Sequence, residues 1–150
     1  MKLNKTFGIA GALTAALFAL GTGSAHADTP DKYGGVSIQT DDSVIGVFGK
    51  YEIKELDGSG LLNGISARSG VFFGDDFSAN VSVTADKDIT DNITAFAGPV
   101  VGYDSSDEDV NLGLALGADY QIGRSDFVVN ATGIVGTSDA SLRLGVGYGF

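Results

Sequence analysis

The stretch LRLGVGYGF at residues 142–150 alternates without a break between large apolar residues and either Arg143 or glycine. Successive side chains of a β-strand point to opposite faces, so one face of this segment is apolar and the other is nearly bare. The pattern predicts a strand with a single apolar face that ends on the aromatic residue Phe150.

The beginning of the chain has the features of an export signal. Lys2 and Lys5 precede an apolar stretch over residues 7–20, and the segment closes on Ala25-His26-Ala27. This arrangement predicts a secretory signal peptide over residues 1–27, cleaved after Ala27. The alternative is a single anchoring helix, but the apolar stretch is short for a span of about 20 residues and contains glycines.

Cleavage would leave residues 28–150 as one domain, with all 19 acidic residues and seven of the nine Lys and Arg. The resulting formal charge of −12 makes nucleic acid an improbable partner. The chain has no Cys, so disulfides and thiolate chemistry are excluded. After the signal peptide no apolar run is long enough for a spanning helix, so any membrane insertion must use strands.

Eight segments of alternating polarity follow one another, separated by clusters of Asp, Gly and Ser that predict turns. They cover residues 33–40, 43–54, 61–73, 76–86, 92–103, 110–121, 126–135 and 141–150. Eight strands of about 10 residues with turns of about 4 fit residues 28–150, whereas ten strands would not. We therefore expect an all-β fold, an eight-stranded antiparallel up-and-down β-barrel.

Alternation alone does not say which face of the barrel is inside, because a soluble barrel would turn the apolar face inward. Three features favour a membrane barrel with the apolar face outward: the terminal Phe150, a second face made of small polar residues, and the placement of aromatics. That second face is poor in the Lys and Glu typical of a soluble surface. Its members include Gly35, Ser37, Gly64, Ser66, Asn80, Ser82, Thr84, Asn111, Asn130, Thr132 and Arg143.

Aromatic residues gather near the two ends of the expected strands, as in the interfacial girdles of membrane barrels. The set expected at the periplasmic end is Tyr33, Tyr51, Tyr120, Phe127, Tyr148 and Phe150. The set expected at the outer end is Phe73, Phe77 and Tyr103.

With the Ala25-His26-Ala27 site, eight short amphipathic segments and LGVGYGF at residues 144–150, the chain resembles the small OmpA/OmpX-type and opacity-type outer-membrane proteins. The resemblance implies a bacterial outer-membrane location, contact with lipid and lipopolysaccharide, and a last strand, with Tyr148 and Phe150, read by the outer-membrane assembly machinery. Adhesins and invasins of this kind have long outer loops. All outer connections here are short, which argues against an adhesin.

The residues give no basis for catalysis or for a cofactor. The only His is His26, inside the expected signal peptide, so histidine-dependent hydrolysis and His or Cys zinc sites are disfavoured. No pair of carboxylates stands out from the turn-forming Asp residues. We therefore expect a protein that is not an enzyme.

Two groups of charges remain as candidate sites. The charges expected to face the lumen are Lys50, Glu52, Lys54, Arg68, Asp119 and Arg143. They could form a gated ion path, but a narrow eight-stranded interior favours a plug whose charges pair with one another.

The other group is acidic and lies in the expected outer turns: Asp41, Asp42, Asp75, Asp76, Asp104, Asp107, Glu108, Asp109 and Asp139. Weak divalent-cation binding at Asp104, Asp107, Glu108 and Asp109 is conceivable, although Asp and Ser are also ordinary turn residues.

The pattern as a whole favours a monomeric, non-catalytic barrel with a structural, envelope-maintenance or surface-contact role. The alternatives are a narrow channel for ions or small solutes, and a soluble exported barrel that binds an apolar ligand.

Overall fold

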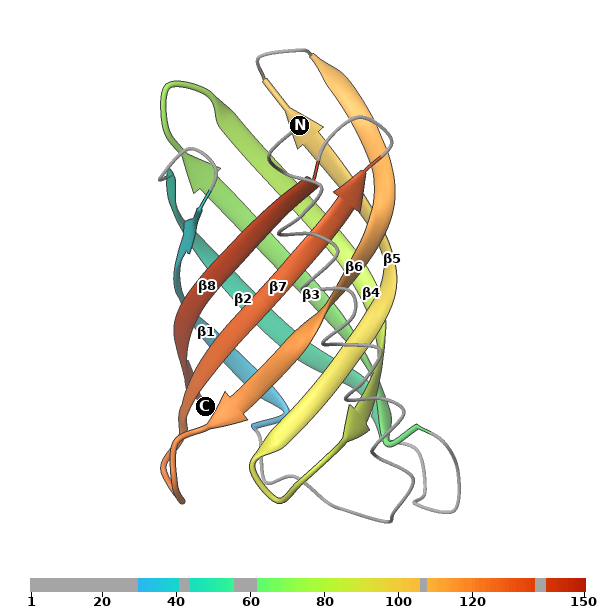
Figure 1. Ribbon diagram of the computed structural model, residues 1–150, viewed down its shortest axis with the longest axis vertical. Coiled ribbons are helices and arrows are strands. Elements are labelled where there is room, and N and C mark those ends of the chain that lie inside the picture. The colour runs from blue at the N-terminus through green and yellow to red at the C-terminus, as the bar shows by residue number, and fades with distance from the viewer. Residues whose placement is uncertain (1–29, 41–43, 56–61, 106–107, 137–139) are drawn as a thin grey trace.

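The computed structural model describes residues 30–40, 44–55, 62–105, 108–136 and 140–150, which form eight strands (Figure 1). The strands are β1 (Lys32–Gln39), β2 (Val44–Glu55), β3 (Gly64–Phe73), β4 (Phe77–Asp88), β5 (Ile93–Asp104), β6 (Asp109–Gln121), β7 (Phe127–Gly136) and β8 (Ala140–Gly149). Within these ranges the chain has no helix of the length and hydrophobicity needed to cross a membrane. The expected signal peptide, residues 1–27, lies outside the described residues.

Each strand pairs with the next in an antiparallel manner, and β8 pairs with β1 to close the barrel. The closing register places Tyr33 opposite Gly149 and Gln39 opposite Arg143. Closure leaves no free sheet edge, because every strand has two hydrogen-bonded neighbours. The strands are tilted across the barrel axis in Figure 1, as closure of a sheet requires. The predicted fold class is confirmed.

We call the end of the barrel where β1 begins and β8 ends the base, and the opposite end the rim. The base is the lower end in Figure 1. Tyr51, Tyr120 and Phe127 lie near the base, whereas Phe73 and Phe77 lie near the rim.

The apolar face of the strands points outward. In β8, Leu144, Val146 and Tyr148 are exposed while the glycines between them are buried. Elsewhere the exposed fractions of Val36 and Leu112 are 60% and 61%. Further exposed apolar residues include Ile38, Ile45, Val47, Ile53, Val81, Val83, Val101, Val110, Leu114, Val129 and Val135. A soluble barrel would bury these residues, so the structure argues against the soluble, ligand-binding alternative.

Exposed aromatic residues occur at both ends of the apolar band, as predicted. Phe127 packs against Tyr148 near the base with ring centroids 5.1 Å apart, and Phe73 packs against Phe77 near the rim at 5.8 Å. Tyr33 was placed in this set, and that prediction is wrong. Its side chain is only 1% exposed and points into the lumen. Every second residue of a strand shares a face, so Tyr33 lies on the same inward face as Gly35 and Ser37.

The interior is not lined by small polar residues alone, since four aromatic rings lie inside it: Tyr33, Phe48, Phe72 and Phe96. Inward-facing glycines make room for these rings. A Cβ atom at Gly147 would lie 2.9 Å from the Tyr33 ring, and one at Gly117 would lie 2.8 Å from the Phe96 ring.

Likewise, a Cβ atom at Gly145 would lie 2.6 Å from the Phe48 ring, and one at Gly70 would lie 2.8 Å from the Phe72 ring. Two glycines of the terminal segment, Gly145 and Gly147, are therefore required by the packing of the lumen, and not only by the pleat of the strand.

Candidate functional site

Arg68 in β3 lies at the centre of the lumen and contacts residues of four other strands, β1, β4, β5 and β6. Its Nη1 atom lies 2.9 Å from Oδ2 of Asp119 in β6 and donates a hydrogen bond of 3.0 Å to the Tyr33 hydroxyl of β1. That hydroxyl donates in turn to Oδ1 of Asp119 at 2.7 Å, which also accepts from Nδ2 of Asn130 in β7 at 2.6 Å. The carboxylate of Asp119, which is fully buried, is therefore held by a cation and two neutral donors.

Asp86 in β4 is the second buried carboxylate. It lies 3.5 Å from Nη2 of Arg68 and 3.7 Å from Nζ of Lys50 in β2. It also accepts hydrogen bonds from Ser66 and, at 2.8 Å, from Thr84. Inward residues of β2, β3 and β4 thus meet around one carboxylate, as the register of these strands requires.

Lys50, Arg68, Asp86 and Asp119 together form what we call the lumen ion cluster. Each of them is less than 9% exposed, and two positive charges face two negative charges. Burial of an isolated charge is costly, whereas a balanced and hydrogen-bonded set recovers most of that cost. The cluster carries no net charge and joins strands β2, β3, β4 and β6.

Aromatic rings complete the surroundings of the lumen cations. The guanidinium of Arg68 lies 3.6 Å from the ring centroid of Phe96, and that of Arg143 lies 4.0 Å from the centroid of Phe72. Nζ of Lys50 lies 6.0 Å from the Tyr33 ring. The faces of these rings attract the cations and fill the space around them.

The structure brings together three of the predicted lumen charges, Lys50, Arg68 and Asp119. Glu52 lies closer to the base and is partly exposed, and Lys54 is exposed where the register of β2 and β3 shifts. A bulge changes the facing of the residues next to it, so the prediction that Lys54 lines the lumen is wrong.

Two members of the site were missed. Asp86 follows Thr84 by two residues, so the alternation of β4 already placed it inside, but the predicted segment ended there. Tyr33 was assigned to the outer face, although the spacing to Ser37 gave the correct facing.

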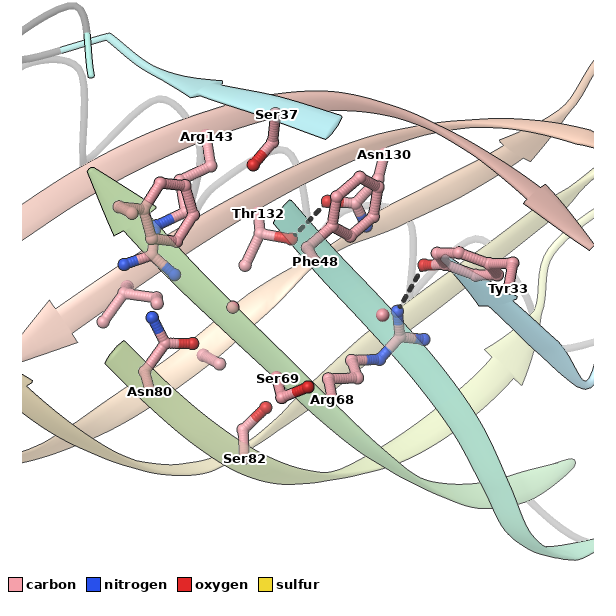
Figure 2. Close-up of a pocket in the computed structure, with 15 residues that line it drawn as sticks. Tyr33, Ser37, Phe48, Arg68, Ser69, Asn80, Ser82, Asn130, Thr132 and Arg143 are labelled. Carbon is pink, nitrogen blue, oxygen red and sulfur yellow. Dashed lines mark hydrogen bonds between the residues drawn. The ribbon is translucent and has the colours of Figure 1, made fainter. Parts of the chain in front are cut away.

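A cavity of about 30 Å³ lies beside Arg68 in the lumen (Figure 2). It is lined by Tyr33, Ser37, Phe48, Gly49, Arg68, Ser69, Gly70, Phe72, Asn80, Ser82, Ala115, Asn130, Thr132, Ile134 and Arg143. A volume of this size has room for very few water molecules. Arg68 of the ion cluster and the rings of Tyr33, Phe48 and Phe72 form part of the cavity wall.

The rim residues proposed as weak cation ligands are only partly described. Asp104 and Asp109 are cross-strand neighbours of β5 and β6, and Glu108 precedes Asp109 in the turn. Asp41, Asp42, Asp107 and Asp139 lie outside the described residues. Among the residues described, no three His, Cys, Asp or Glu side chains are grouped so that they could hold a metal ion.

No protein-family model and no curated protein matches the sequence. Among solved structures, the chain is similar to one from the de novo design of transmembrane β-barrels, with a TM-score of 0.57 and 12% identity over 82% of this chain and 98% of that one. It is also similar to the designed barrel TMB2.3, solved by solution NMR, with a TM-score of 0.57 and 13% identity over 83% of this chain and 98% of that one. At this identity the likeness concerns the fold, and the chain has the fold of a transmembrane-type β-barrel.

Proposed function

We propose that this chain is a non-catalytic integral protein of a bacterial outer membrane, with a structural or envelope-maintenance role and contacts through its rim. One observation carries the proposal: an apolar band surrounds a closed barrel whose lumen is filled by rings and a neutral ion cluster. A surface of this kind suits the hydrocarbon of a bilayer, and a filled lumen suits a scaffold better than a pore.

The distribution of charge supports an orientation with the rim outside. The exposed Lys and Arg among the described residues are Lys32, Lys54 and Arg124, all at the base. The described charges of the rim turns are acidic: Asp75, Asp76, Asp104, Glu108 and Asp109. Divalent cations that bridge anionic lipopolysaccharide would also screen this acidic rim, so we propose lipopolysaccharide and such cations as its partners.

The last strand is the proposed contact with the outer-membrane assembly machinery. Tyr148 and Phe150 face outward at the base, and Phe150 is 86% exposed. This role rests on the resemblance of the terminal segment to small outer-membrane barrels. We further propose that the assembled protein is a monomer, because the closed barrel needs no second chain to complete its sheet.

Fractionation of cells that express the full chain tests the proposal. We expect the protein in the outer-membrane fraction of a Gram-negative host, as a band whose electrophoretic mobility differs between unheated and boiled samples. Recovery in the soluble periplasmic fraction, with no change of mobility on boiling, would reject the membrane location.

A narrow channel is the second candidate, and the polar lining beside the cavity is the observation that favours it. Purified protein in planar bilayers separates the two. A plug predicts conductance at the baseline of the empty bilayer. Steady single-channel currents in the wild type, lost when Arg68 is replaced, would favour the channel.

A further inference from the structure

Polar side chains from five strands, β1, β3, β4, β7 and β8, line the cavity in the lumen, and three of these side chains are the donors of interest. These are Ser37 from β1, Asn80 from β4 and Arg143 from β8. Asn80 is opposite Gly70, which is two residues closer to the rim than Arg68. These three residues therefore lie on the rim side of the lumen ion cluster and form a separate group.

Two of these side chains carry buried polar atoms that have no hydrogen-bond partner. They are Oγ of Ser37, whose residue is 4% exposed, and Nδ2 of Asn80. A buried donor without an acceptor is costly and rare in folded proteins. Nδ2 of an asparagine can only donate, so the missing partner of Asn80 must be an acceptor.

The arrangement around the cavity is rich in donors. Figure 2 shows the amide nitrogen of Asn80 on the side that faces the guanidinium of Arg143. Two acceptors of the lumen are already engaged, since Oδ1 of Asn130 accepts from Thr132 and Oδ1 of Asp119 accepts from Tyr33 and Asn130.

The size of the cavity limits what can meet these donors. At about 30 Å³ the cavity has room for a water molecule or for a halide ion. A water molecule accepts two hydrogen bonds and must place two protons of its own. A halide accepts from several donors at once and adds a negative charge beside the guanidinium.

We propose that this cavity is a binding site for a halide-sized monovalent anion, held by Nδ2 of Asn80, the hydroxyl of Ser37 and the guanidinium of Arg143. Chloride is the anion of this class present in ordinary media. The site stands apart from the proposed membrane role, because it depends only on the interior of the barrel.

Unfolding of the refolded protein in detergent tests the site in solution. Sodium chloride or bromide replaces sodium gluconate at constant sodium concentration, and the urea midpoint is measured. A ligand that binds only the folded state raises the midpoint, so the wild type is stabilised by halide and not by gluconate. Asn80→Asp puts a carboxylate in place of the donor, and we expect it to lose this halide-dependent shift.

Asn111→Asp is the matched control. Asn111 faces inward on β6 and lies opposite Gly102, which is itself opposite Asn80, but it does not line the cavity. This control makes the same change of charge on the same side of the lumen and should keep the full halide response. Asn80→Ala removes the donor without adding charge and replaces Asn80→Asp if that variant gives no heat-modifiable band.

Crystals of the wild type soaked in bromide locate the ion directly. The proposal expects an anomalous peak within the cavity, beside Asn80 and Arg143. Only water in the cavity, or an Asn80 amide turned so that its oxygen meets the guanidinium, would overturn it. An equal halide response in the Asn80 and Asn111 variants would overturn it as well, because the effect would then come from the surface.

Discussion

At the scale of single residues, Arg68 does more than any other side chain to hold the lumen together. It contacts Asp119, Asp86, Tyr33 and the Phe96 ring, which come from four different strands. Removing one partner of a buried ion pair leaves a charge without compensation, which costs far more than the pair contributes as a whole.

We therefore predict a large loss of stability for Arg68→Met, which keeps the stem of the side chain and removes its charge. The free energy of unfolding in urea should fall by about 3 kcal/mol, because two buried carboxylates then share Lys50 alone. Arg124→Met, at an exposed site in the turn after β6, is the control and should stay within about 0.5 kcal/mol of the wild type. Equal effects of the two changes would contradict the account of the cluster.

The inward glycines carry a second prediction at this scale. Gly147→Ala places a Cβ atom 2.9 Å from the Tyr33 ring, and overpacking of this kind costs about 2 kcal/mol. Gly102→Ala is also an inward glycine, but the nearest atoms to its Cβ are 3.7 Å away or more. Urea unfolding should show a clear loss for Gly147→Ala and almost none for Gly102→Ala. A loss in both would mean that the effect comes from the strand backbone and not from the ring.

At the scale of the strand, alternation decided most of the fold. Every predicted segment differs from its strand by three residues or fewer at either end, since turn residues and polarity mark both ends. Alternation also gave the outward face of β8 and of the rim half of β6, where Val110, Leu112 and Leu114 are exposed.

The prediction failed at Tyr33, which was assigned to the outer face as an aromatic residue although the alternation of β1 places it inside. Tyr33, Phe48, Phe72 and Phe96 are large and apolar in character, yet all four lie inside the barrel. Tyr33 packs on Gly147 of β8 and Phe96 packs on Gly117 of β6, so these contacts depend on a register that one strand does not reveal, whereas Phe72 packs on Gly70 of its own strand. Three of the four members of the lumen ion cluster were predicted. Alternation also places Asp86 inside, but its contacts with Lys50 and Arg68 depend on the pairing of β2, β3 and β4.

The outward face of β6 allows a prediction for a whole strand. Leu114 lies near its middle and Val110 near its rim end, and both are exposed. In lipid vesicles, Leu114→Arg should lower the free energy of unfolding by about 3 kcal/mol, since a charge near the bilayer midplane is poorly solvated. Val110→Arg should cost about 1 kcal/mol or less, because it lies at the interface. Equal costs at the two depths would show that the band does not lie in the hydrocarbon.

At the scale of the whole molecule, the barrel turns the usual arrangement of a soluble protein inside out. The lumen ion cluster and small polar residues lie inside, and many Val, Leu and Ile residues of the strands face outward. The rings near the base and the rim bound this apolar band at its two ends. The closed sheet and the apolar exterior are those of a transmembrane-type β-barrel.

The central claim is that the apolar face of the strands points outward and the polar face points into the lumen. Because the chain has no Trp, a single introduced Trp can report the facing of one residue at a time. Phe72 and Phe73 are neighbours in β3, with exposed fractions of 1% and 60%. A single Trp is introduced as Phe72→Trp or as Phe73→Trp, and its fluorescence is recorded in vesicles of brominated lipid. Quenching of the second variant with protection of the first is the predicted result. Quenching of Phe72→Trp with protection of Phe73→Trp would contradict the outward apolar face.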